Sequence, residues 1–524
     1  MSINTTRRSG EKQLVFITVL ITIVLGLTLA GCVAATSVSV YPGASQDASF
    51  ENGTARQLRT TIKDILSAPP LGQVLWGVGI RSLEQGDWLY QRNSDVLMVP
   101  ASAMKIITLA TAARKLGWND RFETTLSSNG LISDGFLNGD LVIQGSGDPT
   151  IDDKIFATWA KQLRIAGVHT IGGRIIGNDR VVVADGLIQE LVLPHFGAGW
   201  SWDDLVFGFA APIGPLQYRG NVVRIHIEPG IEPGAAANVS VGTPGSSLKI
   251  VKQVTTATRE EPNLLLLRRV AGKKVLVVEG RIAEGADTVV RQVAVHNPTG
   301  FFVQGLKAAL IQHGLRIAGQ ALDIDELDTT EQLSVRQNLN ELIRHYSEPL
   351  SRSAVVMMKQ SDNLYAESIL RRLGTVSSNR TLSGPEVVTE SLRTMGLDKT
   401  SAIVADGSGL SRYNYLTAAT LISVLVKLQR NPTDQNNFVS TLPIAAQDGT
   451  LKNRMTGTLA AGNVRAKSGS MSQVRSLAGF ATTTDGEQIA FAFIANNFGI
   501  NPTLVTGAID EAVVAIAAFS RHMK

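Results

Sequence analysis

Apolar and polar positions change their pattern twice along this chain. Before about Arg121 and after about Ser334, alternating runs such as Trp88–Arg92 occur beside segments with helical spacing, such as Thr503–His522. Between these two points glycine is frequent and the apolar runs are short, which is typical of strands. The pattern predicts a mixed α/β region that is interrupted by a mainly β region.

The expected helices share apolar residues at helical spacing. They are Arg56–Ser67, Ala101–Leu116, Phe301–His313, Ser353–Gln360, Leu364–Leu373, Leu416–Gln429 and Thr503–His522. The expected strands are short apolar or alternating runs. They are Val74–Ser82, Trp88–Arg92, Leu141–Gln144, Arg174–Ile176, Val181–Val183, Val222–Ile227, Val239–Val241, Lys249–Thr255, Lys274–Glu279, Thr288–Val295, Arg475–Thr483 and Glu487–Asn496.

Strands near both ends, with helices between them, predict one discontinuous α/β (α+β) domain around an antiparallel sheet. Its two parts are expected at residues 56–122 and 334–524. A large, mainly β insertion is expected at 123–333, and it is long enough for one domain or two nested domains. The 524 residues are 44% hydrophobic and 18% charged, which suits a multi-domain globular protein.

The first 31 residues have the pattern of a bacterial export signal. Arg7, Arg8 and Lys12 are positive, and Leu14–Leu29 is apolar and uncharged. The sequence Leu-Ala-Gly then precedes Cys32, the only cysteine, as in a lipobox. We therefore expect a lipoprotein-type signal peptide that is cleaved before Cys32, which would carry the lipid.

Two other interpretations of the N-terminus remain open. Leu14–Ala35 is long enough to be an uncleaved membrane anchor, and a plain secretory signal would also fit. All three export the chain, so we expect a periplasmic protein that is attached to the membrane by a lipid or an anchor. Residues 32–55 are rich in Ala, Ser and Gly, which predicts a flexible tether.

The first candidate for chemistry is Ser102, which is followed by Lys105 at the start of an expected helix. Residues three apart lie on one helical face, so the lysine amine can reach the serine hydroxyl. The helix is apolar nearly all round, and burial lowers the pKa of a lysine toward the range of a general base. Pro100 suits a helix start. The spacing alone is weak evidence, because Ser246 and Lys249 repeat it in a turn–strand context.

Two later segments strengthen this hypothesis. Ser361 and Asn363 lie between two expected helices, where a hydroxyl and an amide can relay a proton and hold a carbonyl, although both are also ordinary capping residues. Lys467, Ser468 and Gly469 form the only Lys-Ser/Thr-Gly sequence. On a strand they could bind a substrate carboxylate while glycine lets the backbone approach a ligand, but an edge strand protected by a lysine is the alternative.

Ser-x-x-Lys, Ser-x-Asn and Lys-Ser/Thr-Gly occur here in the order found in penicillin-binding proteins and serine β-lactamases. Longer matches accompany them from about Leu71 to the C-terminus. These are residues 100–102, 138–141, 145–149, 361–367, 406–412 and 448–451. The chain resembles the D-alanyl-D-alanine carboxypeptidases of the penicillin-binding protein 4 type, peptidase family S13. One departure is Ser468, where the family usually has threonine; the hydroxyl remains, so we expect activity to be kept.

The resemblance implies a β-lactamase/transpeptidase-like catalytic domain and the large insertion between Lys105 and Ser361. It implies a serine D,D-peptidase that acts on peptidoglycan peptides as carboxypeptidase or cross-link endopeptidase, and that β-lactams inhibit. Ser102 would be the nucleophile and Lys105 its base. Ser361 would pass a proton to the leaving amine, and Asn363 would hold the peptide. Lys467, with Ser468 and Gly469, would bind the terminal carboxylate, and the backbone N–H groups of Ser102 and Ser470 would form the oxyanion hole.

The segment that holds Trp200, Trp202 and Asp204, followed by Phe209, has two interpretations. It could line a peptide pocket in which Asp204 binds a cationic side chain while Arg412 binds a carboxylate. The resemblance implies contact with the diamino-acid side chain of the substrate at such positions. The alternative is an aromatic packing corner with solvated acids.

Several functional classes are disfavoured. The seven histidines show no metal-ligand spacing, no Gly-x-Ser-x-Gly sequence occurs, and the Gly-Ser-Gly at 145–147 lacks the third glycine of a dinucleotide loop. We therefore expect no metal and no cofactor. The net charge of +4 and the lack of a dense Lys/Arg tract argue against nucleic acid. A β-lactamase or esterase, and a non-catalytic peptidoglycan-binding lipoprotein, are the rival functions.

Overall fold

The computed structural model describes residues 53–180, 195–242, 248–270, 275–375 and 383–522. The predicted signal segment, Cys32 and most of the predicted tether lie outside the described residues, as do the predicted strand Val181–Val183 and Ser246. Among the described helices, none combines the length and the hydropathy that crossing a membrane requires.

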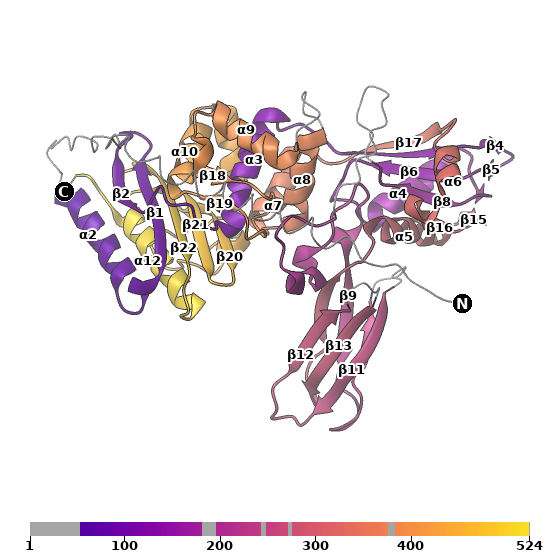
Figure 1. Ribbon diagram of the computed structural model, residues 1–524, viewed down its shortest axis with the longest axis horizontal. Helices are drawn as coiled ribbons and strands as arrows, with labels where there is room; N and C mark the ends of the chain where they lie inside the picture. Colours follow the sequence, from indigo (N-terminus) through magenta and orange to yellow (C-terminus); the bar gives the residue numbers. More distant parts are fainter. Residues whose placement is uncertain (1–52, 181–194, 243–247, 271–274, 376–382, 523–524) are drawn as a thin grey trace, which may run out of the picture. The chain divides into compact units, whose positions relative to one another are not determined.

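A five-stranded antiparallel sheet joins the two ends of the described chain (Figure 1). Its order is β2 (Trp88–Arg92), β1 (Leu75–Ser82), β22 (Gln488–Asn496), β21 (Val474–Thr482) and β20 (Arg465–Met471). β1 pairs with β22 over its whole length, so an early strand and a late strand are neighbours. The predicted discontinuous α/β arrangement is confirmed, and the strand pairs β1–β2 and β21–β22 each form an antiparallel hairpin.

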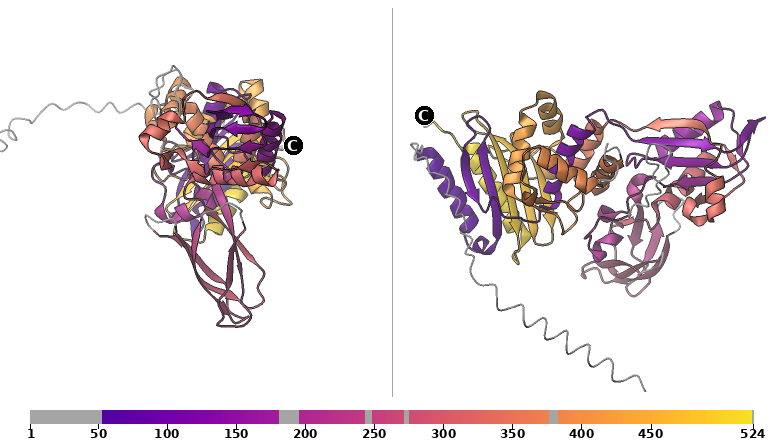
Figure 2. Two further views of the ribbon diagram at one scale, coloured as in Figure 1. Left: turned by 90° about the vertical axis from the view of Figure 1, so that its right-hand side faces the viewer. Right: turned by 45° about the horizontal axis from the view of Figure 1, so that its top comes forward.

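Helices cover both faces of this sheet, which explains why β22 is apolar at almost every position. Along β22, Phe491 and Phe493 belong to the core under α2 (Gly53–Ser67) and α12 (Pro502–Ala518). The alternate residues Ala490, Ala492 and Ile494 pack against the opposite helical layer. Figures 1 and 2 show the sheet between these two layers. α2 begins at Gly53, within the stretch predicted as tether.

The opposite layer consists of helices, two of which carry the candidate residues Lys105 and Asn363. They are α3 (Met104–Lys115), α7 (Leu350–Lys359), α8 (Asn363–Thr375), α9 (Gly384–Thr394), α10 (Ala418–Gln429) and α11 (Pro432–Thr441). α3 is buried from Met104 to Ala113, as its sequence, apolar nearly all round, predicted. The helix that was predicted to begin at Ala101 begins with a short 3₁₀ turn, η2 (Ala101–Ala103), and becomes an α-helix at Met104.

The described part of the inserted region contains four sheets, and the two larger ones mix parallel and antiparallel strand pairs. One has the order β16 (Ala321–Asp323), β8 (Ile175–Asn178), β6 (Leu141–Gly145), β3 (Glu123–Ser128) and β17 (Asn340–Tyr346). The other has the order β15 (Arg316–Ile317), β7 (Thr170–Ile171), β5 (Phe136–Asn138) and β4 (Leu131–Ser133). β17 lies after residue 333, so the partner of β3 follows the predicted border of the insertion.

Two longer helices pack within this region, and the short helix α6 (Thr329–Ser334) follows them in the chain. α5 (Pro298–Gln312) corresponds to the predicted helix at Phe301–His313. α4 (Asp153–Ile165) was not expected. Its signal was present, because Asp152 accepts hydrogen bonds from the N–H groups of Lys154 and Ile155 as a helix N-cap and buried apolar residues follow at helical spacing.

Between β8 and α5 the chain forms two three-stranded sheets. Their strands are β9 (Val222–Glu228), β10 (Asn238–Val241), β11 (Lys249–Ala257), β12 (Leu264–Arg269), β13 (Val275–Ala283) and β14 (Val289–Ala294). All but β12 overlap strands that the sequence predicted. Their buried residues join those of α4 and α5 in one core.

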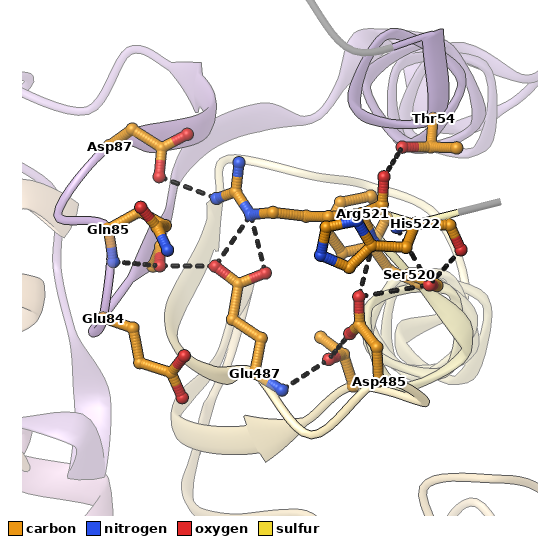
Figure 3. A network of polar contacts seen from close by, with 12 residues as sticks. Thr54, Glu84, Gln85, Asp87, Asp485, Glu487, Ser520, Arg521 and His522 are labelled. Atoms are coloured by element: carbon orange, nitrogen blue, oxygen red, sulfur yellow. Dashed lines mark hydrogen bonds and ion pairs between the residues drawn. The ribbon is translucent and has the colours of Figure 1, made fainter.

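An ion-pair network holds the end of the described chain against the large sheet (Figure 3). The Nε of Arg521 donates to both carboxylate oxygens of Glu487, at 2.9 and 2.8 Å, and its Nη2 donates to Asp87 at 2.7 Å. Glu487 is buried and also accepts from the Ser82 hydroxyl. The network therefore joins the β1–β2 turn, the β21–β22 turn and the segment after α12.

Candidate active site

Ser102 lies at the centre of the 3₁₀ turn before α3, and neighbouring elements fix the backbone that leads to it. The Asn496 side chain exchanges two hydrogen bonds with the backbone of Val99, at 2.8 and 3.0 Å. The Ser476 hydroxyl donates to the Pro100 carbonyl at 2.6 Å. Ala101 has a φ of 48°, a left-handed value that costs a non-glycine residue free energy. The last two strands of the large sheet thus hold the turn that carries the serine.

The predicted contact between Ser102 and Lys105 is present. The Lys105 Nζ donates to the Ser102 Oγ at 3.0 Å, to the Asn363 Oδ1 at 2.7 Å and to the Ser408 carbonyl at 2.7 Å. Lys105 has no exposed surface, and this burial lowers its pKa to about 8, while Asp406 is the strongest of the negative groups that oppose the shift. An amine with that pKa can accept a proton near neutral pH.

The second lysine of the site contacts the second serine. The Lys467 Nζ donates to the Ser361 Oγ at 2.8 Å and to the Ser468 carbonyl at 2.6 Å. Burial holds the pKa of Lys467 well below its usual range, and the positive charge of Lys105 adds to this shift. Ser361 has a φ of 59° in the loop between α7 and α8. The five predicted catalytic residues are therefore joined by hydrogen bonds in two groups, around Lys105 and around Lys467.

Strand β20 is an edge strand of the large sheet and presents its residues to the site. A Cβ on Gly469 would lie 2.2 Å from the Ser476 Oγ and 2.9 Å from the Ser102 backbone nitrogen, so only glycine fits. The Ser468 hydroxyl donates to the Thr450 hydroxyl at 2.6 Å. The strand can therefore pass directly beside the nucleophile.

A pocket of about 340 Å³ opens on these groups. Its lining includes Ser102, Ser361 and Asn363 together with Ser470, Asp204, Phe209 and Arg412. Burial raises the pKa of the Asp204 carboxyl, and the charge of Arg412 opposes that shift. Phe209 is 50% exposed and stacks on Phe207 with ring centroids 5.6 Å apart. A cation and an anion thus stand in the same pocket as the nucleophile.

The two tryptophans differ from these pocket residues. The indole N–H of Trp200 donates to Asp406 at 2.8 Å, so Trp200 fixes the 406–414 loop and does not line the pocket. Trp202 is 61% exposed and is also absent from the lining. The pocket interpretation thus fits Asp204 and Phe209, and it was wrong for the tryptophans.

The Phe209 carbonyl accepts from the Asn363 Nδ2 at 2.8 Å, so the insertion orients the amide that contacts Lys105.

Three participants were assigned no role from the sequence. The Ser408 carbonyl accepts from Lys105, and a backbone acceptor leaves no residue-type signal. Thr450, in the 3₁₀ helix η8 (Gly449–Leu451), accepts from the Ser468 hydroxyl on β20. Glu367 is 4% exposed and accepts from the N–H groups of Gly407 and Ser408 at 3.0 and 2.8 Å. Its signal was a glutamate on an apolar helical face, one turn after Asn363.

One group of carboxylates in the described chain has the spacing of a metal site. Asp179, Asp323 and Asp325 each place an oxygen within 4.8 Å of the others. Asn297 donates to Asp323 and Thr299 donates to Asp179, at 2.7 and 2.9 Å, so protein groups already satisfy part of their bonding capacity. These residues are not among those that line the pocket around Ser102.

Residues 58–519 match the D-Ala-D-Ala carboxypeptidase 3 (S13) family. The chain belongs to this family. A D-alanyl-D-alanine carboxypeptidase from Actinomadura sp. (strain R39) is 29% identical over 480 residues, which cover 89% of this chain and 85% of the relative. The S13 resemblance that the motifs predicted is confirmed.

Solved structures agree with the S13 assignment. Penicillin binding protein 4 (dacB) from Haemophilus influenzae matches with a TM-score of 0.76 and 27% identity, and the match covers 87% of this chain and 99% of that one. The same protein complexed with a β-lactam matches with a TM-score of 0.71 and 25% identity, over 87% of this chain and 98% of that one. The predicted catalytic fold is thereby confirmed.

Proposed function

We propose that this protein is a serine D,D-peptidase that removes the terminal D-alanine from peptidoglycan stem peptides through an acyl-enzyme on Ser102. The observation that carries the proposal is the 3.0 Å contact between the Lys105 amine and the Ser102 hydroxyl in a pocket that also holds Ser361 and Asn363. A buried lysine with a pKa of about 8 supplies the base that a serine nucleophile needs.

Acylation follows from these contacts. Neutral Lys105 takes the Ser102 proton as the Oγ attacks the carbonyl carbon between the two D-alanines. The oxyanion is received by the backbone N–H groups of Ser102 and Ser470, and a pre-aligned donor of this kind is worth about 2.7–4 kcal/mol. Ser361 passes its hydroxyl proton to the leaving amine and takes a replacement from the Lys467 ammonium that donates to it, and D-alanine departs.

Substrate is held from three sides. Asn363 holds the peptide amide, and Lys467 with Ser468 holds the terminal carboxylate, whose negative charge favours the ammonium form of Lys467 against the effect of burial. Asp204 and Arg412 suit the amino and carboxylate groups of a diamino-acid side chain. Water then hydrolyses the acyl-enzyme and frees Ser102. When the leaving amine belongs to a neighbouring stem peptide, the same steps cleave a cross-link as an endopeptidase.

β-Lactams enter the same pathway as inhibitors, because a strained cyclic amide with a carboxylate mimics the D-alanyl-D-alanine end. The related penicillin binding protein 4 that was solved with a β-lactam supports this step. The two rival functions predict different behaviour of Ser102 with a β-lactam. A β-lactamase would release the acyl group from Ser102 rapidly, and a wall-binding lipoprotein would not be acylated at Ser102.

Labelling with fluorescent penicillin tests the proposal. Wild type should form a stable adduct and release D-alanine from purified muropeptides, and Ser102→Ala should do neither. An unlabelled wild type would favour the binding protein, and an adduct lost within seconds would favour the β-lactamase. Digestion of cross-linked muropeptides measures the endopeptidase share.

We also propose that the chain is exported and is anchored in the periplasm by a lipid on Cys32. The positive, apolar and small-residue order of residues 7–32 supports this localisation. Mass spectrometry of the purified N-terminus should find a diacylated or triacylated Cys32. An intact Met1 would indicate the uncleaved anchor, and an unmodified later residue would indicate a secretory signal.

A further inference from the structure

Glu367 carries a buried carboxyl group beside the active site. This group has no role in the reaction steps proposed above. It lies on α8 one turn after Asn363, so both side chains leave the same face of that helix. Only 4% of Glu367 is exposed. A carboxyl group in such a place costs free energy unless it makes specific contacts.

The contacts of Glu367 lead to the catalytic amine through one peptide segment. Its Oε1 accepts from the N–H of Gly407 at 3.0 Å and from the N–H of Ser408 at 2.8 Å. The Ser408 carbonyl accepts from the Lys105 Nζ at 2.7 Å. Because Glu367 fixes the N–H of Ser408, it restrains the residue whose carbonyl aims the lysine at Ser102.

The loop that carries Ser408 is held at its other positions as well. Asp406 accepts from the N–H groups of Gly409 and Ser411, at 2.8 and 2.6 Å. Gly409 has a φ of 83°, and a Cβ there would lie 1.9 Å from the Ala101 carbonyl oxygen. The loop thus rests on the residue before the nucleophile, and Glu367 anchors it beside the amine.

Glu367 and Lys105 also titrate in the same range. Burial, together with the charge of Asp406, raises the pKa of Glu367 to about 8, and burial lowers the pKa of Lys105 to about 8. The negative form of Glu367 favours the ammonium form of Lys105. The other charged groups that act on this pair are Asp362, Asp406, Arg371 and Lys467.

We propose that Glu367 is a positioning residue that aims Lys105 through the Ser408 carbonyl and, by its own protonation state, shifts the pH at which Lys105 becomes a base. The inference rests on the proposed serine peptidase function. A neutral Glu367 still accepts the two N–H groups, and it removes one of the negative charges that, with Asp406 and Asp362, favour the ammonium form of Lys105.

Two substitutions separate the two effects. Glu367→Gln keeps an acceptor oxygen but can never be negative, so the maximal acylation rate should stay within about threefold of wild type while the acidic limb of its pH profile moves about one unit lower. Glu367→Ala frees the loop, so acylation should fall at least about tenfold at every pH. Glu511→Gln, on the exposed side of α12, is the matched control and should leave the profile unchanged.

The measurement is the second-order rate of acylation by fluorescent penicillin across pH, with thermal unfolding of each variant. An acidic limb that is unmoved in a folded Glu367→Gln overturns the inference, as does a Glu367→Ala enzyme as fast as wild type. A wild type that fails to label refutes the peptidase function itself, so the two failures are distinguishable.

Wild-type protein supplies an independent readout in case Glu367→Gln does not fold. Infrared titration of protein with ¹³C-labelled glutamate should show a carbonyl band of a protonated carboxylic acid that disappears near pH 8. No glutamic acid band at neutral pH would refute the charge effect. In Lys105→Met the same band should persist but should disappear at a different pH. That shift would support the electrostatic coupling between Glu367 and Lys105.

Discussion

Lys105 and Lys467 are two buried lysines of one site, and the charge of Lys105 helps to depress the pKa of Lys467. Each amine has its own serine, at 3.0 and 2.8 Å. Because two buried positive charges repel each other, protonation of both at once is disfavoured. The site therefore favours a state in which at least one amine is neutral and can accept a proton.

Acylation of Ser102 should accelerate as pH rises and level off above about pH 8, because Lys105 is a base only in the form that dominates above its pKa of about 8. Lys105→Gln should slow acylation by about 10²–10⁴-fold, the usual contribution of a general base. Stopped-flow labelling with fluorescent penicillin measures both. Lys63→Gln, on the exposed side of α2, is the control, and a flat wild-type profile would contradict the role of Lys105.

Gly469→Ala should disable the enzyme without unfolding it. The added methyl group would meet the Ser476 hydroxyl and the Ser102 nitrogen, so β20 must move away from the nucleophile. We expect acylation to fall about 10²-fold, as for a misplaced oxyanion donor. Gly507→Ala, in α12 with open space around it, should acylate normally and gain about 0.5–1 kcal/mol of stability. Equal activity of the two variants would refute the close approach.

Asp204→Asn should weaken binding of peptides that carry a free side-chain amine. A lost charge-assisted contact of about 1.5–3 kcal/mol raises KM roughly tenfold or more. Acylation by a penicillin that lacks such an amine should change little. Asp203→Asn removes a neighbouring carboxylate that does not line the pocket and is the control. If both variants alter KM equally, Asp204 has no specific role in recognition.

Arg521→Met should destabilise the fold, because it leaves the buried carboxylate of Glu487 without its cation (Figure 3). We expect a loss of about 2–3 kcal/mol, seen as a lower urea midpoint. Arg393→Met breaks an exposed pair with Glu390 and should not shift the midpoint measurably. An equal shift in both variants would mean that burial of Glu487 contributes nothing.

The catalytic fold was predictable because its elements have strong local signals. The Ser102 helix is apolar throughout, and β22 is an apolar run with a turn at Asp485-Gly486 before it. α4 was missed although Asp152 marks its start, because the frequent glycines around it suggested strands. The frequency of glycine over a long region predicts secondary structure less well than a single N-cap that is followed by apolar residues at helical spacing.

The site was predictable as a set of side chains but not as a set of contacts. Three short motifs named Ser102, Lys105, Ser361, Asn363 and Lys467. Nothing in residue identity shows that a main-chain carbonyl at Ser408 completes the lysine's environment, since every residue carries one. Nor could Trp200 be assigned to a loop bond with Asp406, because that bond joins segments more than 200 positions apart.

The bond from Asn363 to the Phe209 carbonyl has a consequence for anyone who wishes to trim this protein. Excising the long excursion between the two halves of the catalytic domain would remove an acceptor that orients a reactive amide, and Trp200 with it. A miniature version would keep every motif residue and still lack part of their scaffold.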